Sequence, residues 1–292
     1  MAGKALAEHP DIAKLDFTGG TATGKAIGAA VGANVKHYCA ELGGNCPVIV
    51  FADCDVTEAV NGVAFGAFVA SGQTCVSAKR ILVEESIFED FVARLVHKAA
   101  HLRLGDPRDL STQMGPVISA QQLKVIEDMV EASKAEGAVA LTGGQRAPAS
   151  RSGPGLDGGF FYEPTVLGSV EPHMTCFQEE IFGPVISVTP FKDEAHALAL
   201  ANDSKYGLGG AVWTQDVRRA HRVARDVSAG VFWVNAHHRN DPSAPWGGFH
   251  ESGIGRENGV DAYREYTEAK TTVVRLSDQK ENWFDDVSAR YS

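Results

Sequence analysis

Apolar residues along this chain follow two periodicities that alternate from the amino terminus onward. Ile87, Phe91 and Leu95 recur at helical spacing, so they predict the apolar face of a helix over residues 85–102. The run Val48-Ile49-Val50-Phe51 instead has the length and β-branched content of a buried strand. By the same criteria, further strands are expected at residues 15–18, 36–40, 81–83, 138–142, 160–167, 185–191, 210–214, 230–234 and 270–276, and further helices at 25–33, 57–69, 120–136, 194–202 and 216–228.

Strands and helices that alternate in this way predict an α/β protein with a largely parallel sheet, because parallel neighbours are joined by helical crossovers. Residues 145–159 are rich in proline, serine and glycine and are expected to form the loosest surface loop. Residues 277–292 are polar and are expected to lie on the surface. We find no internal repeat that would suggest a solenoid.

Composition narrows the class of protein. The 292 residues, 44% hydrophobic and 22% charged, are typical of a soluble globular protein with one large or two medium domains. A formal net charge of −10 argues against a nucleic-acid surface, and no apolar run is long enough to cross a bilayer. The first ten residues lack the apolar core of a signal peptide. We therefore expect neither nucleic acid nor a membrane as a partner.

The cysteines and histidines do not predict a metal site. The five cysteines form no C-x-x-C pair, and an odd, scattered set argues against a disulfide framework and for a reducing compartment, so the cytoplasm is the expected location. The adjacent His237 and His238 would point apart on a strand, which favours a polar loop over a metal site.

Cys75 lies in a stretch of small and turn-forming residues, Ser71-Gly72-Gln73-Thr74-Cys75, between an expected helix and an expected strand. Free backbone N–H groups at such a turn can favour a thiolate and can hold a reacting oxyanion. The alternative is that Cys75 is a small buried hydrophobic residue, which is the commoner fate of a single cysteine.

Glycines follow the first expected strand, at Gly19, Gly20 and Gly24, and a helix comes next. This order can form a phosphate cradle, because glycine allows a close approach to the helix amino terminus. The alternative is a turn that only packs the helix on the strand. A triphosphate-binding P-loop is disfavoured, since Ala26 stands where that motif needs a serine or threonine.

Glu41 ends an expected strand and is followed by Leu42-Gly43-Gly44. A carboxylate in a partly apolar cleft has a raised pKa and can act as a general base. A solvated or helix-capping glutamate is the alternative interpretation.

Six motifs, in this order, resemble the aldehyde dehydrogenase superfamily over nearly all of residues 1–276. They are Phe17-Thr18-Gly19-Gly20-Thr21, Glu41-Leu42-Gly43-Gly44, Gly72-Gln73-Thr74-Cys75, Glu179-Glu180-Ile181-Phe182-Gly183-Pro184-Val185, Tyr206-Gly207-Leu208 and Pro245-Trp246-Gly247-Gly248. The resemblance implies a partial Rossmann-type cofactor domain and a parallel-sheet α/β catalytic domain.

The resemblance also implies a chemistry. Cys75 matches the nucleophile that attacks an aldehyde to form a thiohemiacetal, which becomes a thioester after hydride transfer. Glu41 matches the base that activates water to release a carboxylic acid, and this favours acid formation over acyl transfer to coenzyme A. The cofactor implied is NAD or NADP.

The remaining site residues are implied in the same way. Cofactor contacts are expected from Gly19, Gly20, Thr21, Gly24, Leu42, Glu180 and Phe182. Trp246 and Thr74 are expected to line the site of a small aldehyde substrate, and the Pro-Trp-Gly-Gly form is similar to that of members acting on amino- or betaine-type aldehydes. The strand at 270–276 matches the segment that family members use to form homodimers or homotetramers.

Three departures from the family pattern accompany this resemblance. Gly20 stands where a serine is usual, and Asn45 stands where a lysine is common. Residues 1–16 resemble the middle of the family's cofactor domain, whose first two-fifths therefore has no counterpart in this chain. We expect a remnant of that domain at 1–43, a catalytic thiol domain at 44–250, and a return helix, oligomerisation strand and tail at 251–292. The alternative function is that of a truncated, non-catalytic relative acting as an assembly or interaction piece, and a third possibility is a segment of a longer parent.

Overall fold

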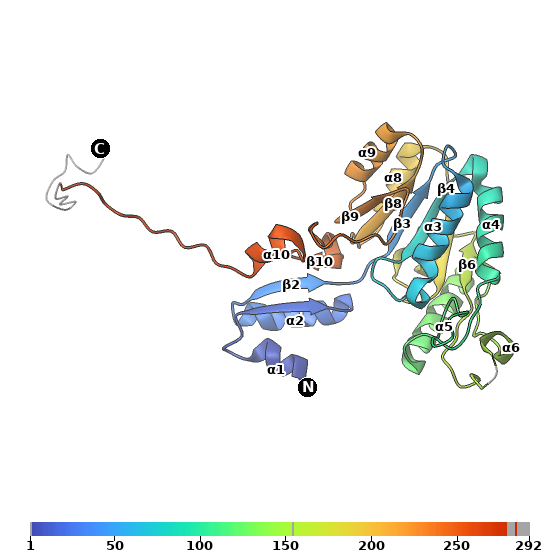
Figure 1. The fold of residues 1–292 in the computed structure, drawn as a ribbon, viewed down its shortest axis with the longest axis horizontal. Helices are drawn as coiled ribbons and strands as arrows, with labels where there is room; N and C mark the ends of the chain where they lie inside the picture. The colour runs from blue at the N-terminus through green and yellow to red at the C-terminus, as the bar shows by residue number, and fades with distance from the viewer. Residues whose placement is uncertain (1, 154, 279–283, 285–292) are drawn as a thin grey trace.

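A seven-stranded sheet forms the centre of the larger part of the molecule (Figure 1). The structure is a computed structural model that describes residues 2–153, 155–278 and 284. The strand order is β5-β6-β7-β4-β3-β8-β9, and every neighbouring pair is parallel except β5 and β6. The strands are β3 (Cys46–Val50), β4 (Ala78–Glu84), β5 (Val139–Thr142), β6 (Thr165–Gly168), β7 (Val185–Phe191), β8 (Gly209–Trp213) and β9 (Val231–Val234). The expected α/β fold with a largely parallel sheet is confirmed.

Helices cover both faces of this sheet, because alternate residues of its strands point to opposite sides. Val48 and Val50 pack with α3 (Val56–Phe68) and α4 (Phe88–Ala100), whereas Ile49 packs with the helices of the other face. That second layer consists of α5 (Ala120–Ala135), α8 (Glu194–Asn202) and α9 (Val217–Asp226). Short helices α6 (Ala149–Ser152) and α7 (Thr175–Gln178) lie in the connections.

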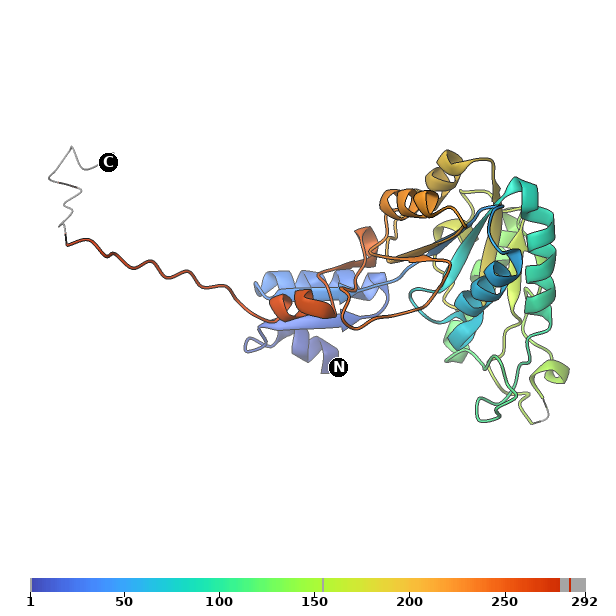
Figure 2. The same cartoon turned by 45° about the horizontal axis from the view of Figure 1, so that its top comes forward.

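A second, three-stranded sheet lies beside the first, in the order β1-β2-β10 (Figures 1 and 2). Parallel strands β1 (Lys14–Thr18) and β2 (His37–Glu41) are joined by α2 (Thr21–Ala33), and the short β10 (Gly253–Ile254) returns antiparallel to β2. Helices α1 (Ala2–Glu8) and α10 (Gly259–Glu265) complete this part. Only four residues separate β2 from β3, so the chain passes directly from the small sheet into the large one.

The strand expected at 270–276 is not formed. Residues 267–278 are all described, and they carry neither helix nor strand. They run away from both sheets as an extended segment (Figures 1 and 2). A strand requires a neighbour with which to exchange backbone hydrogen bonds, and high β-propensity alone does not supply one.

Several expected boundaries also move. The helix expected at 25–33 begins at Thr21, the strand expected at 160–167 is confined to Thr165–Gly168, and the helix expected at 85–102 begins as a 3₁₀ turn, Glu85–Ile87. Helix α1 and strand β10 were not expected. Of the polar tail at 277–292, residues 279–283 and 285–292 lie outside the described residues. No helix in the described part of the chain is long and apolar enough to span a membrane.

Candidate active site

Cys75 lies in a tight turn that follows three residues of left-handed backbone. Ala70, Ser71 and Gly72 have φ of 50°, 57° and 67°, and the two that carry a Cβ each cost about 1 kcal/mol in this region. The turn itself is closed by the N–H of Ser77, which donates to the carbonyl of Thr74 at 3.0 Å. Cys75 is thereby the second residue of the turn and is half-buried.

Buried Lys79 holds this strained segment in place. Its ammonium donates to the carbonyls of Gly72 at 2.9 Å and of Gly183 at 2.6 Å. Burial lowers the pKa of Lys79 to about 8, while the charge of Glu180 acts in the opposite direction. One ammonium group therefore ties the thiol turn to the loop that carries Phe182.

The surroundings of Cys75 favour its protonated form. Burial raises the pKa of the Cys75 thiol to about 11, and the charges of Glu180 and Glu41 add to the rise. The backbone N–H groups of Cys75 and Val76 act in the opposite direction, because they favour the thiolate. The resting thiol is therefore protonated at neutral pH.

Alkylation of Cys75 by iodoacetamide is expected to be slow at pH 7. Its rate should rise about tenfold for each pH unit up to about pH 10, because the thiolate is the reacting form and the pKa of Cys75 is about 11. Mass spectrometry of digested samples would follow Cys75 beside the other cysteines. A rate that levels off near pH 7 would contradict this assignment.

Glu41 ends β2 and is buried, with 2% of its surface exposed. Neither carboxylate oxygen has a hydrogen-bond partner among the described residues. Burial, and then the charge of Glu257, raise the pKa of Glu41 to about 7, although Trp246 and Arg256 offset part of this rise. A carboxylate with this pKa can accept a proton at neutral pH.

Glu180 is a second carboxyl group whose burial raises its pKa to about 7, with the N–H of Gly44 and the charge of Lys79 acting in the opposite direction. A Cβ on Gly43 would lie 2.4 Å from Glu180 Oε2, so glycine permits this close approach. Glu180 Oε1 is buried without a partner in the described part of the chain. The carboxyl group therefore has an unused hydrogen-bond acceptor.

Gly44 packs closely against the backbone of the thiol turn. A Cβ at this position would lie 2.3 Å from the carbonyl oxygen of Cys75, a distance that side chains do not adopt. Gly44→Ala is therefore expected to displace the turn and to lower the rate of a reaction catalysed by the Cys75 thiol at least about tenfold, which corresponds to about 1.4 kcal/mol. Steady-state kinetics would test this, with Gly158→Ala as the control, because a Cβ on Gly158 meets nothing within 4 Å and this residue does not line the cavity. Full activity of Gly44→Ala would contradict it.

A cavity of about 510 Å³ brings most of the expected site residues together. Its lining includes Cys75, Thr74, Gly19, Gly20, Leu42, Glu180 and Phe182, and also Thr18, Gly43, Gln73 and Gln122. Glu41 does not line the cavity, but it is close enough for its charge to raise the pKa of Cys75. The cavity lies where the carboxyl end of the small sheet faces the amino end of the large one.

The amino terminus of α2 meets this cavity at Gly20. This residue caps the helix without a side-chain hydrogen bond, and its backbone is extended. The first N–H groups of a 13-residue helix therefore face a glycine-lined space, which suits an anion such as a pyrophosphate. The free acceptor of Glu180 suits a ribose hydroxyl, so the residues present fit a dinucleotide.

The other expected site residues lie outside the cavity lining. Thr21 is the first residue of α2, and its hydroxyl donates to the carbonyl of Glu251 at 3.3 Å. Gly24 is buried within α2, where a Cβ would lie 2.3 Å from a methyl group of Leu42. Trp246 is half-buried, with its ring centroid 6.3 Å from that of Trp233.

Three residues that line the cavity or contact its surroundings were not predicted as site residues from the sequence. Gln122, on α5, lines the cavity and donates to the carbonyl of Phe182 at 2.9 Å. His238 lies with its Nε2 2.8 Å from the hydroxyl oxygen of Thr74, while His237 is buried with its Nε2 2.8 Å from the carbonyl of Val76. No motif marks these positions, because each acts through a partner that is distant along the chain.

The sequence pattern of the aldehyde dehydrogenase family matches residues 1–272, and the chain belongs to this family. It is similar to the betaine aldehyde dehydrogenases of Brucella anthropi and Brucella melitensis, with 43% and 44% identity over 274 residues. Those residues are 94% of this chain and 55% of each relative, so the chain spans about half the length of the curated relatives it matches.

The fold agrees with this assignment. The crystal structure of betaine aldehyde dehydrogenase from Staphylococcus aureus in complex with NAD⁺ matches with a TM-score of 0.93 and 40% sequence identity. The match covers 97% of this chain and 56% of that one. The resemblance inferred from the six motifs is thereby confirmed.

Proposed function

We propose that this chain carries the site of an NAD(P)-dependent oxidation of an aldehyde to a carboxylic acid. The observation that carries the proposal is that Cys75, Glu180 and the Gly19–Gly20 turn line one cavity. Glu41 lies outside the lining but close enough for its charge to raise the pKa of Cys75. This chemistry requires a thiol that ionises to become the nucleophile and a carboxyl group with a pKa near 7 that acts as a base, and Cys75 and Glu41 are such groups.

The cofactor would be held by this chain's own residues. Gly19, Gly20 and the first turn of α2 would bind the pyrophosphate, and Glu180 and Phe182 would bind the ribose and the nicotinamide ring. When bound, the nicotinamide supplies the hydride acceptor. Lys79 ties the thiol turn to the loop that carries Phe182, so a substrate carbon bound to the Cys75 sulfur would be kept close to the residues that would hold the nicotinamide.

Cys75 would form and break the covalent bond to the substrate. The thiol would first lose its proton to solvent water, and the resulting thiolate would attack the carbonyl carbon. The backbone N–H of Cys75 would donate to the oxyanion of the thiohemiacetal. After the hydride leaves, the carbon is a thioester. Glu41 then removes a proton from water as the water attacks, the C–S bond breaks, and the sulfur regains a proton as the acid departs.

For the substrate, we propose an amino- or betaine-type aldehyde bound near Trp246 and Thr74. The support is the similarity to proteins named betaine aldehyde dehydrogenases and the Pro245-Trp246-Gly247-Gly248 motif. We propose a cytoplasmic homodimer or homotetramer, and three segments at 1–43, 44–250 and 251–292, which serve the cofactor, the catalytic thiol and assembly.

A non-catalytic assembly role is the second candidate. It is favoured by the exposure of Val273, Val274 and Leu276 on the extended segment, with 88%, 69% and 91% of their surfaces exposed. Apolar residues that stand clear of the fold in this way are suited to association with another chain. This role needs neither a reactive thiol nor a bound nicotinamide.

Formation of reduced nicotinamide from NAD or NADP, with aliphatic, aromatic and amino aldehydes, tests the proposed oxidation. Turnover by this chain with any of them would support the oxidation, and the preferred aldehyde would identify the substrate class. Absence of turnover and of nicotinamide binding, together with a defined oligomer in analytical ultracentrifugation, would establish the assembly role instead.

A further inference from the structure

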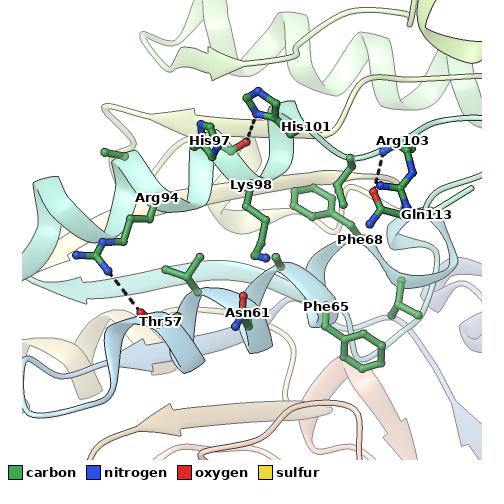
Figure 3. A pocket seen from close by; sticks show the side chains of 15 residues that line it. Thr57, Asn61, Phe65, Phe68, Arg94, His97, Lys98, His101, Arg103 and Gln113 are labelled. Carbon is green, nitrogen blue, oxygen red and sulfur yellow. Dashed lines mark hydrogen bonds between the residues drawn. The ribbon is translucent and has the colours of Figure 1, made fainter. Parts of the chain in front are cut away.

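A larger cavity, of about 880 Å³, lies between α3 and α4 (Figure 3). It runs from Thr57 and Arg94 at one end to Val69 and Gln113 at the other. Six residues of α3 line it, and they span twelve positions from Thr57 to Phe68, which corresponds to a length of about 18 Å. The volume lies within the range of small-molecule sites, and the groove shares no lining residue with the cavity at Cys75.

The floor of this groove is apolar. Val60, Ala64 and Phe68 follow one another at helical spacing along α3, and Leu102 closes the floor beyond α4. The first three are buried with at most 6% of their surfaces exposed, so their packing forms a continuous apolar track. Such a track suits an extended hydrocarbon chain.

The rim of the groove is basic on the α4 side. Arg94 lies three and four residues before His97 and Lys98, and His101 lies four and three residues after them, so the four side chains share one face of the helix. Arg103 follows at the end of the groove. No aspartate or glutamate lines the groove, although the chain as a whole has 37 acidic and 27 basic residues. The local charge is therefore opposite in sign to that of the protein.

The basic side chains of the rim differ in their pairing. The Arg94 guanidinium is already bound to Asp90 at 2.9 Å, and the Nδ1 of His101 lies 2.7 Å from the carbonyl of His97. The Lys98 ammonium has neither an ion-pair nor a hydrogen-bond partner in the described part of the chain. Figure 3 shows its side chain extending from α4 toward the groove. Lys98 is thus the cation most available to a ligand.

We propose that this groove binds a linear aliphatic carboxylate, with its hydrocarbon tail on the track formed by Val60, Ala64 and Phe68 and its carboxylate at Lys98. An apolar floor beside an unpaired ammonium is complementary to a molecule with one anionic end. A cationic amphiphile of the same length would bring a second positive charge to the Lys98 ammonium. The proposal goes beyond the aldehyde chemistry and does not depend on Cys75.

Isothermal titration with decanoate, octanoate and decyltrimethylammonium, each below its micelle concentration, tests the assignment. Decanoate should bind saturably with a stoichiometry of one. Octanoate, which is shorter by two methylenes, should bind up to about fifteenfold more weakly. Decyltrimethylammonium should not bind detectably.

Variants locate the binding in the groove. Lys98→Glu should weaken decanoate binding at least about tenfold, because attraction becomes repulsion, and Ala93→Trp should abolish it by filling the groove from an exposed position. Lys124→Glu is the matched control, since Lys124 is an exposed lysine on α5 outside the groove. Circular dichroism would verify that each variant is folded.

Three results would overturn the proposal. Equal affinity for decanoate and decyltrimethylammonium would show that only apolar contact is involved. Unchanged affinity in folded Lys98→Glu, or equal losses in Lys98→Glu and Lys124→Glu, would remove the groove as the binding site.

Discussion

Replacing Cys75 by alanine is expected to abolish both reduced-nicotinamide formation and ester hydrolysis, with a loss of at least about 10³-fold in kcat. Both reactions pass through a covalent bond to the sulfur, and alanine offers no nucleophile. Pre-steady-state absorbance at 340 nm and nitrophenyl acetate hydrolysis would measure the two activities. Binding of NAD to the variant, followed by tryptophan fluorescence, should persist, because Cys75 is one of several residues lining the cavity.

The matched control is Cys54→Ala. Cys54 is also half-buried, but it follows the carboxyl end of β3. The amino end of β3 is the end next to the site, because the sulfur of Cys46 lies 3.9 Å from the carbonyl oxygen of Cys75. Its removal should leave both activities within about twofold of the parent protein, since distant sites are usually independent. Residual ester hydrolysis in Cys75→Ala at the parental rate would remove the proposed mechanism.

Replacing Glu41 by glutamine is expected to separate the two halves of the reaction. The first turnover should proceed as a burst of reduced nicotinamide, and later turnovers should be slower by about 10²- to 10⁴-fold, because no base activates water for the thioester. In the parent protein the deacylation rate should rise with pH and level off above about pH 7, where Glu41 loses its proton. A steady-state rate without a burst, or an unchanged pH profile in Glu41→Gln, would contradict this role.

The same substitution, which should slow the reaction, should raise the free energy of unfolding at high pH. Burial raises the pKa of Glu41 from 4.5 to about 7, so the native state binds more protons than the unfolded state between these values. The native state therefore loses stability as pH rises through this window, by at most about 3 kcal/mol. Glutamine does not ionise. The free energy of unfolding of Glu41→Gln, measured with urea and compared with that of the parent, should therefore increase from pH 5 to pH 8. The exposed Glu85→Gln should show no such trend.

Local sequence patterns predicted the fold class, because strand-like runs and helical stripes alternate and their packing on one sheet follows from that alternation. They failed at residues 270–276, where β-propensity predicts a strand but no neighbouring strand is present. They also missed β10, a two-residue strand whose formation depends on β2 rather than on its own composition.

Residues that line the cavity could be named from the sequence where they lie in short motifs, as Cys75 and Glu180 do, whereas their roles stay predictions. Burial of Lys79 and of its neighbour Arg80 was not predictable, because their charges suggest solvent exposure, whereas they are 3% and 1% exposed. Their partners include carbonyls more than 100 positions away, at Gly183 for Lys79 and at Leu200 for Arg80. Burial of such charges depends on tertiary partners that a local window cannot include.

The position of the cavity also follows from tertiary structure alone. Ligands of parallel α/β sheets usually lie at the carboxyl ends of the strands, and the small sheet obeys this rule through Gly19 and Glu41. The large sheet contributes its amino ends instead, at Cys46 and near Cys75. The four-residue passage from β2 to β3 brings the two opposite edges together.

The order of strands in the large sheet bears on how fast the chain can fold. Its two earliest strands, β3 and β4, occupy the centre, and they pair with β8 and β7, which are made more than 100 residues later. Pairing over such separations slows folding, because long loops must close before the contacts form. Refolding is therefore expected to be slow and to pass through a state in which both edges of a two-stranded β3–β4 core are exposed to association.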